Sequence, residues 1–239
     1  QKQLYNVVEE MKISAGLAYM PRVFLINADY MNAFASGYSE KSAMVAITKG
    51  LMDKLTRDEL QAVMAHEVSH IRHLDIKLTL TASLLANLSL MVLDVLFYNT
   101  LFNSDDREES KGRNGLAVII LILRYVLPII SMLLLLYLSR RRELMADAGC
   151  VELTRTNEPL ARALIKISDD HTQNRDAYTK AYQQTAHENV RREAYIFDPF
   201  QAGIKASLSP TDLFSTHPSL ATRLAALGFK RRDENADHQ

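Results

Sequence analysis

The sequence predicts a mainly α-helical fold with a small β-sheet, in which one domain is interrupted by a two-helix transmembrane hairpin. Residues 79–102 and 115–138 are each 24 residues long, with 16 and 20 apolar residues respectively. Roughly 20 mostly apolar residues suffice for a helix to cross the hydrocarbon core of a bilayer. Only 8 Gly and 6 Pro occur in 239 residues, which favours helices over turn-rich all-β folds. Short apolar runs between residues 22 and 48 predict the small sheet.

The first 48 residues predict one helix and all the strands. An amphipathic helix is expected over residues 1–19, where apolar residues recur at helical spacing: Leu4, Val7, Val8 and Met11. Residues 22–26 (RVFLI) predict a strand. Residues 30–38 and 43–48 predict a β-hairpin with Gly37 near its turn.

The next helix begins at Thr56, which forms a T-x-x-E capping box with Glu59. We expect this helix to continue into the first membrane span. Beyond the transmembrane hairpin the expected segments are a helix over 140–154, a helix from near Pro159 to near His171, a polar helix over 175–194, an irregular stretch over 195–215, a short helix over 218–227 and a charged tail over 230–239.

Composition excludes some classes of protein. The 28 basic residues balance 28 acidic ones, so overall basicity does not attract this chain to nucleic acid, and we expect no nucleic-acid partner. A single cysteine excludes an intramolecular disulfide framework, and nothing in the chain requires an oxidising compartment. We expect Cys150 to be a small buried residue rather than a reactive one.

Basic residues around the spans predict their orientation. Arg72, His73 and Lys77 precede the first span, and three consecutive arginines, 140–142, follow the second. The positive-inside rule therefore places both flanks on the cytoplasmic side. Residues 1–78 and 139–239 are then two halves of one cytoplasmic domain, separated by the hairpin 79–138.

Each span carries one charged residue, Asp94 in the first and Arg124 in the second. In an antiparallel hairpin the two lie at nearly the same depth, and an unpaired charge there is costly, so we expect them to pair. Two alternatives stay open. Each charge could have a separate polar partner or water, and the spans could instead be buried helices of a soluble bundle.

The motif HEVSH lies in the capped helix and predicts a zinc site. His66 and His70 are four residues apart, so both imidazoles lie on one helical face and can bind one Zn²⁺. Glu67 next to the first histidine is placed to act as general base on a water. The alternative is a solvated helix face with coincidental histidines.

A catalytic zinc needs a third protein ligand. The metzincin pattern is excluded, because His73 and Ile76 stand where that pattern requires Gly and His. His73 lies about 10 Å farther along the helix than His66, too far to share the ion. Glu143 fits, because the hairpin returns the chain to the side it left. Asp147 lies on the same face as Glu143 and can hold a zinc-bound histidine; the alternative for both is a solvated helix at the membrane edge.

Together these motifs resemble a known family. HEVSH, a membrane hairpin, RRRELMADAG, and STHP followed by Arg223 resemble the HtpX-type membrane zinc metalloproteases of bacteria. The chain is more distantly similar to the CAAX prenyl endopeptidases. The resemblance implies a gluzincin-like zinc metalloprotease domain whose zinc ligands, general base and histidine-holding carboxylate fall on these residues: His66, His70, Glu143, Glu67 and Asp147.

Further site residues are implied by the resemblance alone. His217 and Arg223 would face the active site and help to hold the substrate or the oxyanion. Asn32, Ala33 and Phe34 resemble the edge strand that binds a substrate backbone by strand addition. The family begins with two further membrane helices, so we expect this chain to be part of a longer protein.

The resemblance implies a zinc-dependent endopeptidase of the bacterial inner membrane, multi-pass, with its active site on the cytoplasmic side. Its partners would be protein or peptide substrates and the lipid bilayer, and its role would be clearance of misfolded membrane proteins under stress, with self-cleavage. Two alternatives stay open: a CAAX-type prenyl-protein endopeptidase, and a non-catalytic zinc-stabilised membrane scaffold.

Overall fold

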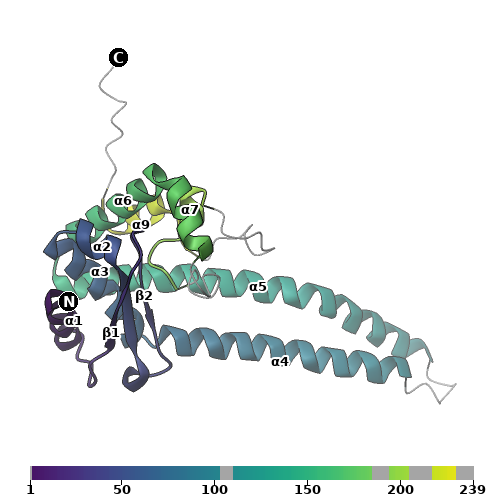
Figure 1. The fold of residues 1–239 in the computed structure, drawn as a ribbon. Coiled ribbons are helices and arrows are strands. Elements are labelled where there is room, and N and C mark those ends of the chain that lie inside the picture. The colour runs from purple at the N-terminus through teal and green to yellow at the C-terminus, as the bar shows by residue number, and fades with distance from the viewer. Residues whose placement is uncertain (1, 103–109, 185–193, 205–216, 230–239) are drawn as a thin grey trace. The chain divides into compact units, whose positions relative to one another are not determined.

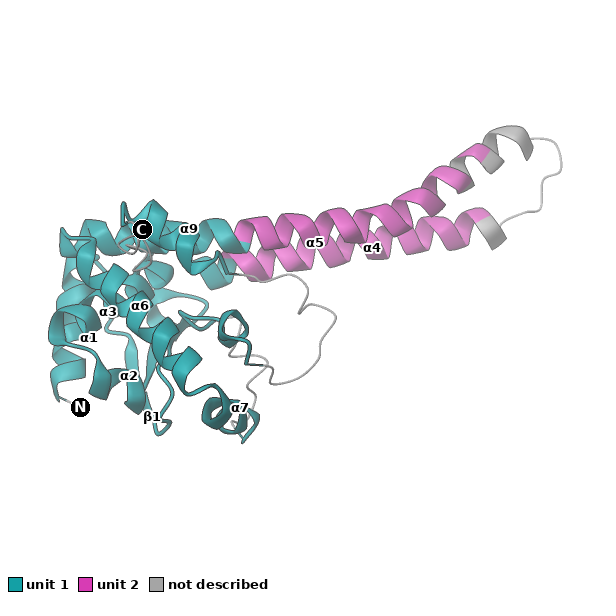
Figure 2. Cartoon of the chain, turned by 90° about the horizontal axis from the view of Figure 1, so that it is seen from above, with its two compact units in different colours: residues 1–77, 139–239 teal, residues 78–138 magenta. Residues whose placement is uncertain are grey.

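The computed structural model of the protein describes all residues except 1, 103–109, 185–193, 205–216 and 230–239. The chain divides into two compact units (Figure 2). Residues 1–77 and 139–239 form the first unit, and residues 78–138 form the second. The fold is mainly α-helical with one small sheet, as the sequence predicts.

The sheet of the first unit has three strands, β1 (Arg22–Ile26), β2 (Ala33–Ser36) and β3 (Met44–Thr48). Their order is β1-β3-β2, with β3 parallel to β1 and antiparallel to β2. The predicted strand and the predicted hairpin are both confirmed. Gly37 in the hairpin turn has φ +133°, and a Cβ there would lie 2.6 Å from the Cα of Ala43, so only glycine fits. A 3₁₀ turn, η1 (Glu40–Ser42), completes the connection.

The first helix, α1 (Lys2–Ser14), buries the four apolar residues that predict it. It ends five residues before the predicted Tyr19. Gly16 has φ +70°, and the N–H of Leu17 donates to the carbonyl of Lys12 at 3.1 Å. This glycine-terminated turn closes the helix, and apolar periodicity alone does not reveal it.

Helix α3 (Arg57–Arg72) is the centre of the first unit. Its capping box forms as predicted: the Thr56 hydroxyl accepts from the N–H of Glu59, and the Glu59 carboxylate accepts from the N–H of Thr56 at 2.9 Å. The helix contacts α1, β2 and a later helix, α6 (Glu158–Gln173) (Figure 1). A short helix, α2 (Lys49–Lys54), precedes it and is not predicted from the sequence.

The expectation that α3 continues into the first membrane span is wrong. Helix α3 ends at Arg72, His73 is its C-terminal cap, and Leu74 adopts a left-handed conformation with φ +55°. A new helix, α4 (Asp75–Phe102), begins at the next residue. A residue in the left-handed region cannot continue a right-handed helix, so the chain changes direction here.

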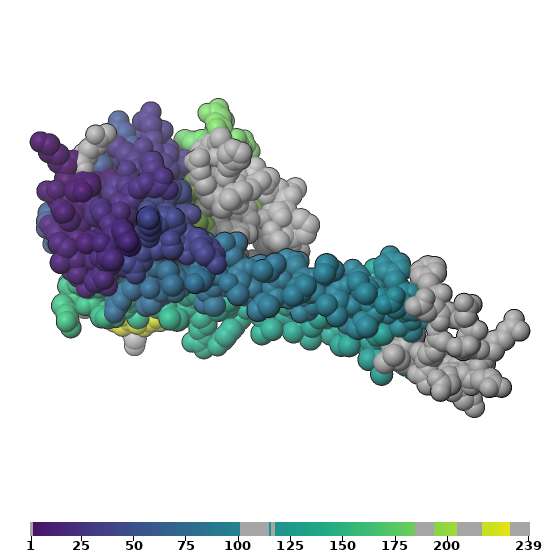
Figure 3. Space-filling view, turned by 90° about the horizontal axis from the view of Figure 1, so that it is seen from below, coloured from purple at the N-terminus to yellow at the C-terminus, as the bar shows by residue number. Residues whose placement is uncertain are grey.

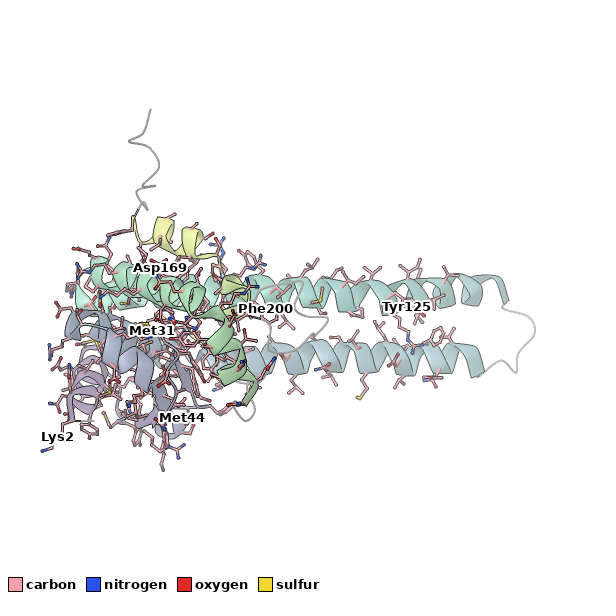
Figure 4. The ribbon with its side chains drawn as sticks, turned by 45° about the horizontal axis from the view of Figure 1, so that its top comes forward. Lys2, Met31, Met44, Tyr125, Asp169 and Phe200 are labelled. Atoms are coloured by element: carbon pink, nitrogen blue, oxygen red, sulfur yellow. The ribbon has the colours of Figure 1, made fainter. Side chains whose placement is uncertain are left out.

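The second unit consists of the apolar parts of α4 and of α5 (Ser110–Thr154), which lie side by side (Figures 2 and 3). Both helices are long and apolar enough to cross a membrane, and their most apolar stretches are 0% and 6% buried. A buried pair of helices in a soluble bundle would hide these residues, so the exposure argues against that alternative. Tyr125, labelled in Figure 4, is 68% exposed.

The predicted pairing of the two intramembrane charges is confirmed. The Nε atom of Arg124 lies 3.0 Å from Oδ1 of Asp94. The guanidinium also lies over the ring of Phe97, 4.8 Å from its centroid. One ion pair therefore joins α4 and α5 in the middle of the second unit.

The remaining described helices belong to the first unit. Helix α6 confirms the helix predicted around Pro159, and α7 (Arg175–Gln184) is the described part of the predicted polar helix. A 3₁₀ helix, η2 (Pro199–Ala202), lies in the stretch predicted to be irregular. The short final helix is α9 (Leu220–Ala226), and the predicted charged tail, 230–239, lies outside the described residues.

Candidate active site

Helix α3 carries the first half of the site. His66 is 0% exposed and Glu67 is 1% exposed, whereas His70 is partly exposed at the end of the same face. Buried imidazole and carboxylate groups are costly unless they are paired or bind a metal ion. Their presence in the central helix indicates that the interior of the first unit contains a functional site.

Helix α5 supplies the second half because it approaches α3 very closely. A Cβ atom at Gly149 would collide with the Ser69 side chain, so the glycine permits this approach. One residue later, the Cys150 thiol donates to the carbonyl of Ala62 at 3.2 Å. Cys150 is fully buried, as predicted, and burial raises its pKa to about 12, which keeps it a neutral thiol. The face of α5 that carries Glu143 is thereby held against the histidines of α3.

Three side chains have the spacing of zinc ligands. The Nε2 atoms of His66 and His70 are 3.1 Å apart, and they lie 3.7 and 3.6 Å from oxygens of Glu143. Tetrahedral ligands about 2.0–2.1 Å from a zinc ion lie about 3.4 Å from one another. His66, His70 and Glu143 therefore match a zinc site with one open position, whereas His73 lies outside this cluster.

The orientation of the imidazoles supports a cation at this position. His66 Nδ1 lies 3.0 Å from Oδ1 of Asp147, and His70 Nδ1 lies 2.6 Å from Oδ2 of Asp75. Nδ1 of His70 donates a hydrogen bond to Asp75, and Nδ1 of His66 faces the Asp147 carboxylate at ion-pair distance, so in both rings Nε2 is the nitrogen that faces the proposed metal position. Two imidazole nitrogens 3.1 Å apart beside the Glu143 carboxylate require a positive charge between them, either a proton or a metal ion, so the residues present fit zinc.

The pKa values of His66 and Glu143 also indicate a site for positive charge. Burial lowers the pKa of His66, but hydrogen bonds to Asp147 and Glu143 outweigh burial and raise it to about 9. Burial raises the pKa of Glu143, but the charges of His217 and His70 and hydrogen bonds to His217 and His66 hold it well below its usual value. The surroundings of the ligands therefore favour positive charge at the position where they converge.

Glu67 is a buried carboxylate set apart from this pairing. Neither of its oxygens has a hydrogen-bond partner in the described part of the chain. Burial raises the pKa of Glu67, although the neighbouring His66 and His70 charges lower it in part. A carboxylate that is buried, without a partner and raised in pKa is a characteristic feature of general bases.

Asp147 is held by Arg223. Arg223 donates from Nε to Oδ2 at 2.9 Å and from Nη2 to Oδ1 at 2.6 Å. Burial alone would raise the pKa of Asp147, but the Arg223 charge and hydrogen bonds from His66 and Arg223 lower it to about 2. The third guanidinium nitrogen, Nη1, donates to the carbonyl of Ile196 at 2.7 Å. Arg223 therefore reaches the site mainly through Asp147, and its Nη1 also lies 3.9 Å from Oε2 of the ligand Glu143.

His217 lies beside the third ligand. It is 4% exposed, and its Nδ1 lies 3.4 Å from Oε2 of Glu143. A cavity of about 700 Å³ also borders His217, and it is lined by parts of α5, α6, η2 and α9, including Arg140, Ser168, Gln201 and Leu220. His217 thus stands between Glu143 and open space.

Asn32 lies in the core rather than on a substrate-binding surface. It is 0% exposed. Its Nδ2 donates to the carbonyl of Phe197 at 3.0 Å and to the hydroxyl of Tyr182 at 3.1 Å, and its Oδ1 accepts from the N–H of Phe197 at 3.4 Å. The Asn32 side-chain amide therefore bonds both the N–H and the carbonyl of Phe197, as the backbone of a paired strand does.

The outer edge of β2 is occupied by the same segment of chain. The N–H of Ile196 donates to the carbonyl of Ala33 at 2.9 Å, and Phe34 forms an antiparallel bridge with Tyr195. Tyr195 and Ile196 are each 1% exposed. The edge expected to receive a substrate strand is thus paired with the protein's own backbone.

Sequence reasoning missed two parts of this site. Helical spacing does not predict Asp75, because on a continuous helix it would lie about 140° around the axis from His70. The break at Leu74 brings it back to the imidazole. The pairing of Tyr195 and Ile196 with β2 also escapes sequence reasoning, because it joins segments about 160 residues apart and residues 195–196 begin a stretch predicted to be irregular.

Comparisons with known proteins agree on one family. The profile of peptidase family M48 matches residues 1–229. A protease HtpX homolog of Helicobacter pylori is 40% identical over 227 residues, which are 95% of this chain and 66% of that protein. A protease HtpX homolog of Dictyoglomus thermophilum is 38% identical over 94% of this chain and 68% of its own length. This chain thus spans just under two thirds of the Helicobacter relative.

The fold itself also has a solved counterpart. The crystal structure of S. mikatae Ste24p matches with a TM-score of 0.55 at 19% sequence identity. The match covers 95% of this chain and 50% of that one. At this identity the likeness concerns the fold alone.

Proposed function

Because this chain belongs to peptidase family M48, we propose that it is the catalytic part of a zinc-dependent endopeptidase anchored in a membrane by α4 and α5. The observation that carries the proposal is the convergence of His66, His70 and Glu143 within 4.8 Å beside the buried, unpartnered Glu67. A purely structural zinc site would have no need of Glu67, which argues against a scaffold without turnover.

His66, His70 and Glu143 would hold the zinc ion, which when bound would polarise the scissile carbonyl and make a water more acidic. Glu67 accepts a proton from the attacking water and later delivers it to the leaving amine. The raised pKa of Glu67 suits this role, because a carboxylate accepts a proton more readily as its pKa rises toward the working pH. Asp147 keeps His66 in the tautomer that presents Nε2 to the metal.

His217 is the better of the two candidates for contact with the oxyanion or the substrate. It lies 3.4 Å from Glu143 and also borders a cavity. Arg223 also lies near Glu143, with Nη1 3.9 Å from Oε2, but its hydrogen bonds go to Asp147 through two nitrogens and to the carbonyl of Ile196 through the third. We assign Arg223 the role of orienting Asp147.

A peptide substrate is proposed to pair with the β2 edge at Ala33 and Phe34. The occupied edge adds a condition, because the segment at Tyr195 and Ile196 must leave before a substrate backbone takes its place. Asn32 would then hold the edge from behind, since its side chain is buried.

The two long apolar helices support a location in a membrane. The arginines at 140–142 favour a cytoplasmic position of the site, and the HtpX-type resemblance favours the bacterial inner membrane. Misfolded or damaged membrane proteins are the proposed substrates, and a role in the stress response follows from the HtpX-type resemblance. A CAAX-type prenyl-protein endopeptidase is the alternative within the same zinc chemistry.

The decisive test compares the purified chain in detergent with its Glu67→Gln variant. Casein cleavage should occur in the unaltered chain, stop with a zinc chelator, return on adding Zn²⁺, and be lost in the variant although the variant keeps its zinc. Zinc-loaded chain that cleaves neither casein nor itself would refute the endopeptidase proposal. Cleavage confined to prenylated CAAX peptides would favour the alternative.

A further inference from the structure

We propose that Asp75 is a positioning residue for the zinc ligand His70, and that the break between α3 and α4 serves to place it. This inference rests on the proposed zinc site. It adds a residue that the HExxH motif and the third ligand do not include, and it links the first membrane-directed helix to the metal.

The contact is short and protected. Asp75 Oδ2 lies 2.6 Å from Nδ1 of His70, and Asp75 is 4% exposed. A carboxylate at this distance accepts the Nδ1 proton in a strong hydrogen bond. The proton is then fixed on Nδ1, so Nε2 presents its lone pair toward His66 and Glu143, where the metal would be held.

The backbone is shaped for this contact. Leu74 has φ +55°, a backbone conformation that residues other than glycine rarely adopt. The N–H of Leu74 donates to the carbonyl of Ile71 at 3.1 Å. Without this turn, Asp75 would lie about 140° around the helix from His70 and could not reach it. The backbone carbonyl of Asp75 also accepts from Nη1 of Arg142 at 3.1 Å, which ties the turn to α5.

Each of the two histidines thus has a carboxylate beside its Nδ1, and the two carboxylates come from different helices. Asp147 on α5 holds His66 at 3.0 Å, and Asp75 at the start of α4 holds His70 at 2.6 Å. Both α4 and α5 continue into the apolar hairpin. Each membrane-directed helix therefore contributes a carboxylate that orients one zinc ligand.

A structural role must be separated from this one, because an acidic residue in the first turn of a helix also favours the helix dipole. Asp75→Ser keeps an oxygen suited to a helix N-terminus but is too short to reach His70. Asp75→Glu keeps the carboxylate. Asp176→Ser is the matched control, since Asp176 also lies in the first turn of a helix and is exposed.

The experiment measures the zinc dissociation constant of the full chain in detergent, by competition with a chromophoric chelator. Loss of a carboxylate behind a ligating histidine weakens metal binding by about 10- to 100-fold. We expect that loss for Asp75→Ser, partial recovery for Asp75→Glu, and wild-type affinity for Asp176→Ser. The Co²⁺-loaded Asp75→Ser variant should also show an altered visible spectrum, because the His70 ring would no longer be held in place.

A second pair of variants tests the turn. Leu74→Gly keeps the left-handed conformation without strain and should keep wild-type zinc affinity. Leu74→Ile places a β-branched residue where φ is positive and should weaken zinc binding by displacing Asp75. Equal affinities for these two variants would refute the role assigned to the turn.

The outcomes separate this inference from the proposed function. If the wild-type chain binds no zinc, the proposed function fails. If it binds one zinc and Asp75→Ser binds zinc equally tightly with an unchanged Co²⁺ spectrum, only the role of Asp75 fails. A Tm for Asp75→Ser equal to that of Asp176→Ser, together with weakened zinc binding, supports positioning over a structural role.

Discussion

Ionisable side chains are arranged differently in the two compact units. In the first unit, buried carboxylates, histidines and an arginine form a connected network around the candidate ligands, in which Asp147 joins His66 to Arg223. In the second unit, the described side chains at 78–100 and 118–138 include only two charged groups, Asp94 and Arg124, and they pair with each other. The first arrangement concentrates ionisable groups around the candidate zinc ligands, and the second pairs one positive charge with one negative charge.

The contrast shows what each region is built to do. A buried network with an unpartnered base and converging lone pairs is unfavourable unless it binds an ion, so its cost indicates function. An isolated ion pair between two apolar helices gives each charge a partner where an unpaired charge would be costly, which indicates a structural role. Substitutions in the buried network should therefore affect activity, and substitutions in the Asp94–Arg124 pair should affect stability.

The largest expected effect is in the network. Glu67→Gln removes the general base while keeping the size of the side chain, and we expect activity to fall about 100- to 10,000-fold. Zinc content should stay unchanged, whereas His66→Ala should lose both zinc and activity. Casein cleavage and metal analysis on the same samples check this, and tight zinc retention by His66→Ala would overturn the ligand assignment.

His171 should make the first unit sensitive to acid. It is fully buried, its Nδ1 donates to the carbonyl of Ile167 at 2.8 Å, and burial lowers its pKa to about 4. The free energy of unfolding is unaffected by His171 above the unfolded-state pKa of about 6.5. As pH falls from there toward 4, the unfolded chain takes up a proton at His171 and the folded chain does not. The free energy of unfolding then falls by about 1.4 kcal/mol per pH unit, roughly 3 kcal/mol in all. The Tm of the wild type should fall more steeply over this range than that of His171→Gln. Parallel pH profiles would show that His171 is not the sensitive group.

The Asp94–Arg124 ion pair of the hairpin should contribute to the stability of the protein but not to its zinc content. Asp94→Leu leaves Arg124 unpaired, at a cost of about 2–3 kcal/mol in the middle of a membrane. Resistance of the folded protein to denaturation in lipid nanodiscs measures this loss. Zinc content should equal that of the wild type.

The reciprocal exchange is the control for that pair. The double variant Asp94→Arg with Arg124→Asp restores an ion pair between α4 and α5 and should recover the stability lost in Asp94→Leu. If the exchange fails to recover it, the two charges do not stabilise the hairpin through their pairing.

The smallest expected effect is at the surface of the first unit. Arg57 and Glu10 form an ion pair with a 2.7 Å contact, but their side chains are 53% and 42% exposed. Exposed pairs contribute less than about 1 kcal/mol. Glu10→Gln should leave Tm and cleavage unchanged within error, and a large loss of either would show that exposed charges also matter in this unit.

Local signals in the sequence account for much of the fold. The capping box at Thr56, the alternation around Gly37 and the two long apolar runs each specify an element by interactions within a few residues. The end of α1 and the break at Leu74 escape such reasoning. Each depends on a single residue with positive φ, Gly16 in the first case and Leu74 in the second, and apolar periodicity does not predict such a residue.

The residues of the candidate site also fall into those that the sequence predicts and those that only the folded chain reveals. His66, Glu67 and His70 follow from one motif, and Glu143 follows from the return of the chain through the hairpin. The contacts of Asp75 and Ile196 do not follow, because one requires the turn at Leu74 and the other requires a pairing between distant segments. Position around an ideal helix misplaces Asp75, and only the folded backbone corrects it.

The most direct test of the central claim is the zinc K-edge absorption spectrum of the purified, zinc-loaded chain. We predict one zinc per chain, coordinated by two imidazole nitrogens and carboxylate oxygen at about 2.0–2.1 Å, with the imidazole signal lost in His66→Ala. A Zn–S distance of about 2.3 Å, or a spectrum unchanged in His66→Ala, would contradict the account.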